Sequence, residues 1–179
     1  LYHLALVLPQ REDLARLILH LVNNNVEIQG VADHDVSESI YLSGPDDIGI
    51  EVYCDRPAQD WPLDPQGQIE MGTEELDLDD LLLTVKGKSK QWTGLPTNAH
   101  IGHIHLSVAE LEQTERFYTL LGFQLTQKYG DNALFLSSND YHHQLGVNTW
   151  ESSAADPLPA DSAGLRSFEL WVDTPFLSV

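Results

Sequence analysis

The chain has 179 residues, of which 42% are hydrophobic, and a formal net charge of −19. This length can bury a core in one or two small domains, and the negative charge argues against binding to nucleic acid or to an anionic membrane surface. No apolar run approaches the ~20 residues that a membrane span needs. The single cysteine, Cys54, excludes an internal disulfide and fits a reducing compartment such as the cytoplasm.

The first 54 residues predict a β-α-β-β-β unit. A strand over residues 1–8 comes first, and a helix over residues 13–24 follows it. The apolar residues of this helix share one face: Leu14, Leu17, Ile18 and Leu21. Three further strands are expected over residues 26–31, 37–43 and 48–53, with a turn at Gly44-Pro45-Asp46-Asp47 before the last one.

The same order recurs in the second half of the chain, so internal duplication is the main organising feature. We expect a strand over residues 103–108, a helix over 110–121 ended by Gly122, and strands over 123–129, 133–137 and 143–150. A third copy begins with an expected strand over residues 165–172. Residues 55–98 lie between the first two copies and form a connecting arm, with an acidic run and a short helix near residues 76–82.

One histidine stands in the first strand of each unit, His3 in the first and His103 in the second. Glu51 lies between Ile50 and Val52 in the last strand of the first unit, and a carboxylate on such an inner face costs several kcal/mol unless it is paired or metal-bound. Two imidazoles and one carboxylate leave open coordination positions, which favours the non-haem Fe(II) of oxygenases. The alternative is a set of hydrogen-bonded core side chains without an ion.

A site built from two copies of one unit could have a fourth protein ligand, a second glutamate, at the equivalent place in the second unit. Matching Gly49-Ile50-Glu51 with Gly146-Val147-Asn148 puts Asn148 at that place. The sequence therefore predicts three ligands, which favours oxygen chemistry over Lewis-acid isomerisation.

Five stretches in this order resemble a known family: residues 1–3, 33–43, 49–53, 101–106 and 141–150. They are similar to the vicinal oxygen chelate superfamily, which includes glyoxalases, bleomycin-resistance proteins and type I extradiol dioxygenases. Within it they most resemble the catechol 2,3-dioxygenases with two domains and four modules. The turn at residues 44–49 departs from the Asp-Pro-Asp-Gly-Asn-Gly that members often carry.

The resemblance implies an α+β fold, in which paired β-α-β-β-β modules form a curled mixed sheet around a metal site. Residues 1–54 would be the second module of four, 55–98 a linker arm, 99–155 the third module and 165–179 the start of a truncated fourth. In the family the residues corresponding to His3, Glu51 and His103 bind Fe(II), with Mn(II) as an alternative ion.

The resemblance also implies roles for other side chains. His143 lies in the equivalent of the family's His-x-x-Gly motif and is the expected proton shuttle, with His142 as its rival. Tyr41 and His34 are expected to position the diol of the substrate. We expect three more residues to contact substrate, namely His105, His142 and Asn148.

The predicted function is an Fe(II)-dependent extradiol dioxygenase that opens a catechol-type aromatic ring with O2. The expected partners are a small aromatic diol and O2, without nucleic acid or membrane, and the resemblance implies a homo-oligomer. Three alternatives stay open: a Zn- or Ni-dependent glyoxalase-like lyase or isomerase, a metal-free binding protein of the bleomycin-resistance type, and a hydroquinone-cleaving dioxygenase. The ring substituents, the native metal and the oligomeric state also stay open.

Overall fold

The computed structural model describes residues 1–159, 161–162 and 164–170 of the chain. Two β-α-β-β-β units follow one another, which confirms the predicted α+β fold. The first unit contains β1 (His3–Val7), α1 (Arg11–Asn23), β2 (Gly30–Asp33), β3 (Ser37–Ser43), η1 (Pro45–Asp47) and β4 (Gly49–Asp55). The connecting segment carries η2 (Ala58–Asp60) and α2 (Leu78–Leu83). The second unit contains β5 (His100–Ser107), α3 (Leu111–Leu120), β6 (Gln124–Tyr129), β7 (Ala133–Ser137) and β8 (Leu145–Asn148).

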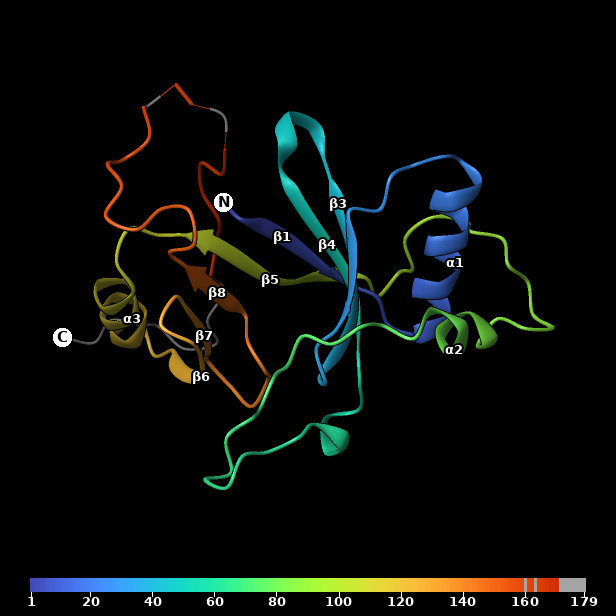
Figure 1. The fold of residues 1–179 in the computed structure, drawn as a ribbon, viewed down its shortest axis with the longest axis horizontal. Helices are drawn as coiled ribbons and strands as arrows, with labels where there is room; N and C mark the ends of the chain where they lie inside the picture. The colour runs from blue at the N-terminus through green and yellow to red at the C-terminus, as the bar shows by residue number, and fades with distance from the viewer. Residues whose placement is uncertain (160, 163, 171–179) are drawn as a thin grey trace.

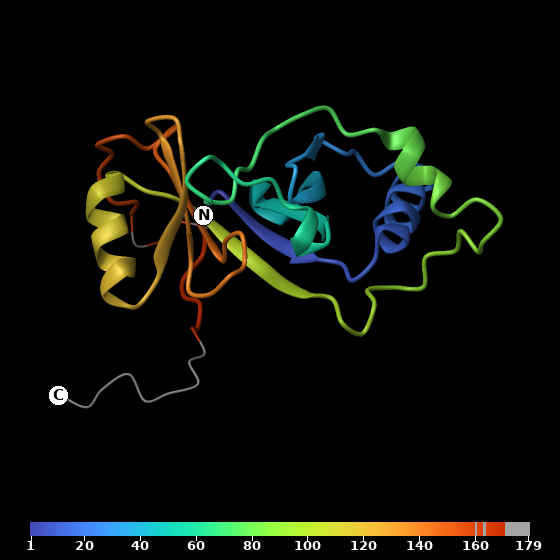
Figure 2. The same ribbon diagram turned by 90° about the horizontal axis from the view of Figure 1, so that it is seen from below.

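The eight strands of the described residues form one mixed sheet in the order β2-β3-β4-β1-β5-β8-β7-β6. The antiparallel pair β1–β5 joins the two units at the centre, and each of these strands runs parallel to the last strand of its own unit, β4 or β8. Figures 1 and 2 show the sheet curling between two helices, with α1 at one end of the molecule and α3 at the other. The first and last strands of both units therefore lie side by side in the middle of the sheet.

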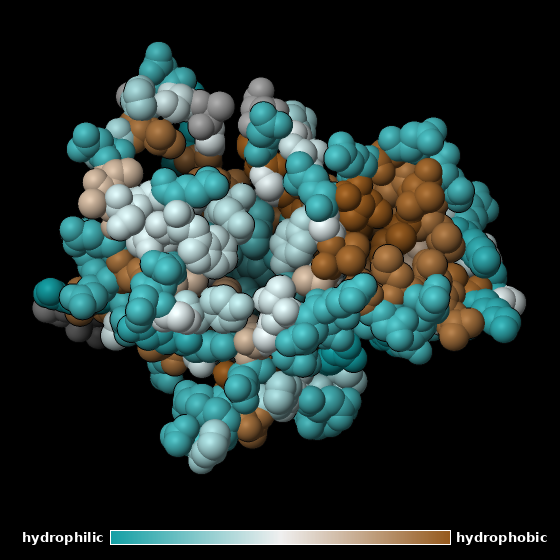
Figure 3. Space-filling model, viewed as in Figure 1, coloured by the Kyte–Doolittle hydropathy of each residue, from teal (hydrophilic) through white to brown (hydrophobic). Residues whose placement is uncertain are grey.

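Alternation along the strands separates the core from the inner face of the sheet. In β4, Val52 and Cys54 belong to the core cluster under α1, whereas Glu51 and Tyr53 point to the opposite face. A second cluster packs under α3 and includes Leu134 from β7. Partly buried apolar residues pack against the cluster under α1, and Figure 3 shows an apolar area on that half of the molecule.

The connecting segment crosses the open side of the sheet. Asp33 at the end of β2 exchanges two backbone hydrogen bonds with Glu74, of 3.0 and 2.8 Å. The side-chain amide of Gln127 in β6 accepts from the backbone amide of Met71 at 2.8 Å and donates to the Met71 carbonyl at 2.9 Å. The segment thus spans from one unit to the other and closes the space inside the curl.

Several strand predictions differ from the structure. The second strand begins at Gly30 instead of residue 26, because the amide of Val26 still bonds to the Leu21 carbonyl at the end of α1. The last strand begins at Leu145 instead of residue 143. Residues 165–170 form no strand, and the rest of the predicted strand, 171–172, lies outside the described residues. No helix in the described ranges is both long enough and apolar enough to span a bilayer.

Candidate metal centre

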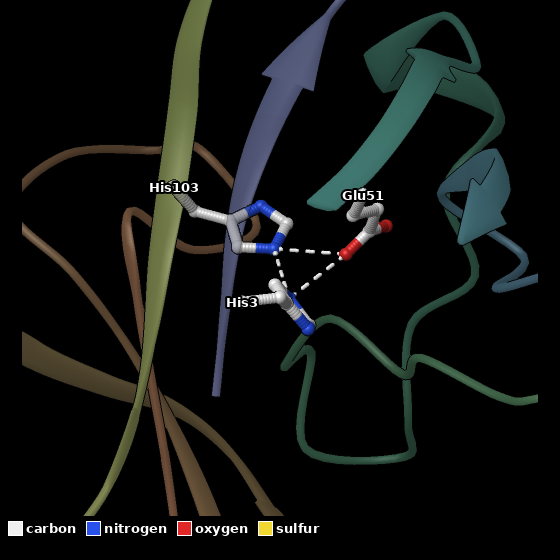
Figure 4. A group of neighbouring side chains, drawn as sticks. All are labelled: His3, Glu51 and His103. Carbon is white, nitrogen blue, oxygen red and sulfur yellow. Dashed lines mark hydrogen bonds and ion pairs between the residues drawn. The ribbon is translucent and has the colours of Figure 1, made fainter. Parts of the chain in front are cut away.

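Three neighbouring strands bring His3, Glu51 and His103 together on the inner face of the sheet. His3 comes from β1, Glu51 from β4 and His103 from β5, in the sheet order β4-β1-β5. Nε2 of His3 lies 3.0 Å from Oε2 of Glu51 and 3.2 Å from Nε2 of His103, and Nε2 of His103 lies 3.2 Å from the same carboxylate oxygen. Figure 4 shows the three side chains pointing to one place. All three residues are buried.

The separations of these three atoms fit a shared divalent cation. Donor atoms at adjacent corners of an octahedron with bonds of about 2.1 Å lie about 3.0 Å apart, and at the corners of a tetrahedron about 3.4 Å apart. The observed 3.0, 3.2 and 3.2 Å lie within the range between these two values. Two imidazoles and a carboxylate on one triangular face are the donor set of non-haem iron oxygenases.

The neighbours of the Glu51 carboxylate fix its orientation and keep it charged, as a metal ligand requires. The hydroxyl of Ser39 donates to its Oε1 at 2.7 Å, so that Oε2 stays directed to the two histidines. Burial alone would raise the pKa of Glu51, but His103 and His3 hold it well below its usual value, so the group is an anion. The second nitrogen of His103, Nδ1, is buried without a hydrogen-bond partner in the part of the chain that the structure describes.

The second unit has no carboxylate at the place that corresponds to Glu51, but the residue there differs from the prediction. The amides of Leu8 and Val108 bond to the carbonyls of Tyr53 and Asn148, respectively, so Asn148 corresponds to Tyr53. Ala5 pairs with Glu51 in the first unit, as His105 pairs with Gly146 in the second. Gly146, and not Asn148, therefore takes the place of the missing fourth ligand.

A cavity of about 240 Å³ opens beside the three ligands. Of the other predicted site residues, His34, Tyr41, His105 and His143 line it. Its aromatic lining residues are Tyr2, Tyr41, Tyr129, Phe135 and Trp150, and Met71, Gly72 and Thr73 of the connecting segment also contribute. The volume is below the ~300–1,000 Å³ of sites for drug-sized ligands. A single substituted ring suits it better than a larger molecule.

His34 and Tyr41 form a directed pair at the cavity wall. Nδ1 of His34 lies 2.9 Å from the Gly72 carbonyl, which can only accept, so Nδ1 carries the proton in the neutral ring. Nε2 of His34 then accepts from the hydroxyl of Tyr41 at 2.7 Å. Burial and the charge of Glu51 raise the pKa of Tyr41, which keeps the hydroxyl protonated. Because this hydroxyl donates its proton to His34, its oxygen can still accept a further hydrogen bond.

His143 lies against the metal-ligand cluster, whereas two predicted contact residues lie behind it. The ring centroid of His143 is 4.2 Å from that of His103, and burial, with the nearby His103, lowers its pKa well below the usual value. His142 is fully buried and does not line the cavity. Asn148 is also outside the lining and bonds to Nε2 of His105 at 3.0 Å.

Ser39 and Asp55, which form hydrogen bonds with Glu51 and His142, respectively, were not identified from the sequence. Ser39 shares a face of β3 with Tyr41, and Asp55 shares a face of β4 with Glu51, so the two-residue period could have identified both. Asp55 bonds to His142 at 2.9 Å and to the hydroxyl of Tyr141 at 2.9 Å. The contact with Tyr141, 86 residues further on, has no local signal in the sequence.

The paired units joined through β1 and β5, with one His-His-Glu cluster inside the curl, define the class of protein: the chain belongs to the vicinal oxygen chelate superfamily. Its sequence is 42% identical over 167 residues to a protein of Bacillus subtilis (strain 168) named catechol-2,3-dioxygenase. The match covers 92% of this chain and 58% of that protein, so the chain spans little more than half of its relative's length. No family model matches the sequence.

Two solved structures resemble the fold distantly. Methylmalonyl-CoA epimerase from Mycobacterium tuberculosis has a TM-score of 0.43 at 10% identity, covering 82% of this chain and 84% of that one. The Mn(II)-bound glyoxalase from Novosphingobium aromaticivorans has a TM-score of 0.26 at 20% identity, covering 80% and 40%. At these scores the similarities do not bear on function.

Proposed function

We propose that this chain carries the active site of an Fe(II)-dependent extradiol dioxygenase, which opens the ring of a catechol-type aromatic with O2. The observation that carries the proposal is the three-ligand cluster of His3, Glu51 and His103, with Gly146 at the place of a fourth ligand. The relationship to a protein named catechol-2,3-dioxygenase supports the same reaction. We also propose a cytoplasmic location, from the single cysteine, and assembly into homo-oligomers.

The cavity has the features that binding of an aromatic diol requires. Tyr2, Phe135 and Trp150 offer apolar ring surfaces on which an aromatic substrate packs. The hydroxyl of Tyr41, donated to His34, accepts from a phenolic O–H of the substrate. The substrate is thereby oriented with its diol toward the three ligands, and orientation of this kind removes part of the entropic barrier to reaction.

His3, Glu51 and His103 would hold Fe(II), which supplies the one-electron chemistry that allows O2 to react with a closed-shell aromatic. The residues of the chain manage the protons. Burial keeps the imidazole of His143 neutral, and a neutral imidazole has one lone pair with which it accepts the proton that the diol releases. The connecting segment and the aromatic side chains line the cavity in which this transfer takes place.

Anaerobic reconstitution of the full chain with Fe(II), followed by a series of catechols and then O2, tests the proposal. We expect a yellow ring-opened product that requires both Fe(II) and O2. Glu51→Gln should abolish it together with binding of Co(II), followed by the visible spectrum of that ion. Glu75→Gln, an exposed carboxylate of the connecting segment, is the matched control and should change neither.

The alternatives predict different results. An O2-independent conversion with Zn(II) or Ni(II) would replace the proposal by the lyase. Binding of aromatic ligands that is unaffected by Glu51→Gln, without product, would replace it by a binding protein.

A further inference from the structure

A row of hydrogen-bonded side chains continues outward from His143 and is not explained by the metal centre. Nδ1 of His143 lies 2.8 Å from Nδ1 of His142, and Nε2 of His142 lies 2.9 Å from Oδ1 of Asp55. The hydroxyl of Tyr141 lies 2.9 Å from Oδ2 of Asp55 and 2.6 Å from the hydroxyl of Tyr53. We call these five side chains the Asp55 network.

The chemistry of the groups fixes the direction of each bond. A carboxylate only accepts, so the hydroxyl of Tyr141 and Nε2 of His142 both donate to Asp55. Because Tyr141 donates to Asp55, its oxygen accepts from Tyr53. Burial raises the pKa of both tyrosines, which keeps them protonated as donors.

The same reasoning shows which ring nitrogen of His143 carries the proton. His142 is fully buried and makes a hydrogen bond through each ring nitrogen, and a neutral imidazole has one donor and one acceptor nitrogen. With its proton on Nε2, His142 accepts at Nδ1. Nδ1 of His143 must therefore donate, and Nε2 of His143 is left without a proton. The structure shows no hydrogen bond to that Nε2 among the described residues.

The surroundings hold this arrangement in place. The ring of His142 packs against Tyr141, with centroids 4.0 Å apart, and against Trp61 at 5.1 Å. Trp61 is itself fixed by a 2.9 Å bond from its indole nitrogen to the Arg56 carbonyl. Asp55 is the outermost acceptor of the network, with 27% of its side chain exposed.

We propose that Asp55, acting through His142, is a positioning residue that holds His143 in the tautomer with an unprotonated Nε2 available to the cavity. The consequence for turnover rests on the proposed function, because it needs His143 as the base. The tautomer itself does not, since it follows from the network alone. A carboxylate that bonds directly to a catalytic imidazole orients it in the same way. Here the imidazole of His142 lies between the carboxylate of Asp55 and the imidazole of His143.

Replacement of Asp55 by asparagine should exchange the donor and the acceptor in the hydrogen bonds that lead from residue 55 through His142 to His143. Tyr141, which accepts from Tyr53, still donates to the carbonyl oxygen of the new amide, so the NH2 group faces His142. Nε2 of His142 then accepts, its Nδ1 donates to His143, and the proton of His143 moves to Nε2. Asp55→Glu retains a carboxylate and should restore the original order.

Long-range ¹H–¹⁵N spectra of the full chain labelled with ¹⁵N-histidine test this directly, both metal-free and with diamagnetic Zn(II). His143 is assigned by the loss of its signals in His143→Gln. We expect a protonated Nδ1 and an unprotonated Nε2 in the unaltered chain, the reverse in Asp55→Asn, and recovery in Asp55→Glu. Asp60→Asn, an exposed carboxylate outside the network, is the control and should leave the spectrum unchanged.

Turnover gives the second readout. In the Fe(II)-loaded chain, Asp55→Asn should lower kcat about 100-fold, within the range for loss of acid–base catalysis, with KM and metal affinity unchanged. A proton on Nε2 of His143 in the unaltered chain, or a tautomer that survives Asp55→Asn, overturns the inference. If Asp55→Asn does not fold, the spectrum of the unaltered chain decides alone. An inactive chain with the expected tautomer contradicts the proposed function and leaves this inference standing.

Discussion

Gly146 should be intolerant of any side chain, because the ring of His105 occupies the space beside it. A Cβ built on Gly146 would lie 2.9 Å from both Cγ and Nδ1 of that ring, about 0.5 Å inside ordinary contact. The ring is only 3% exposed, is held by the 3.0 Å bond to Asn148 and is surrounded by Tyr2 and Trp150. Overpacking of this kind typically costs about 1–3 kcal/mol. We expect Gly146→Ala to lower the free energy of unfolding by that amount.

Urea denaturation followed by circular dichroism measures this cost. Gly30→Ala is the matched control, because a Cβ there meets only Tyr41 at the ordinary distance of 3.8 Å. In a His105→Ala background the cost of Gly146→Ala should disappear, which gives a coupling of about 1 kcal/mol or more between the two sites. Equal costs in both backgrounds, or no cost in either, would refute the assignment of this space to His105.

Four further outcomes are expected. Burial lowers the pKa of His103, so protons compete with the metal for this ligand only at low pH. The affinity for Co(II), measured by titration, should therefore be constant from about pH 8 to 6.5 and should decrease below about pH 6.5. Burial raises the pKa of Cys54 to about 12, so a thiol reagent at pH 8 should label it only after unfolding, roughly a thousandfold more slowly in the native chain. Tyr41→Phe should lower kcat/KM about 10²-fold, as for loss of one oriented polar group, without changing Co(II) affinity. Glu38 is buried and accepts from Arg11 at 2.8 Å, so Glu38→Gln should cost about 1–3 kcal/mol in urea unfolding.

The alternation of side chains between the two faces of each strand made the metal centre predictable. His3, Glu51 and His103 each stand in an apolar strand, and the duplicated order of elements places those strands at the junction of the two units. The register between strands was not predictable in the same way. The glycine match suggested Asn148 as the counterpart of Glu51, whereas the backbone hydrogen bonds place Gly146 there. A shift of two residues keeps the same face, so alternation could not reveal it.

Contacts between the two units were beyond sequence reasoning. The Asp55 network joins β4 to the loop before β8, and the connecting segment reaches Gln127 in β6. Both depend on how far the sheet curls, which no local pattern specifies. The prediction for His142 did not include its hydrogen bond to Asp55, because that residue lies 87 positions away in the sequence.

The two units fill equivalent space in opposite ways, and this difference explains why a duplicated fold has three ligands at its metal centre instead of four. In the first unit the small Ala5 lies beside the large Glu51, and in the second the large His105 lies beside Gly146. A second glutamate at Gly146 would therefore need the removal of His105 as well as a new side chain. The three-ligand set is thus supported by packing as well as by the absence of a carboxylate, and a single substitution cannot convert it to a four-ligand site.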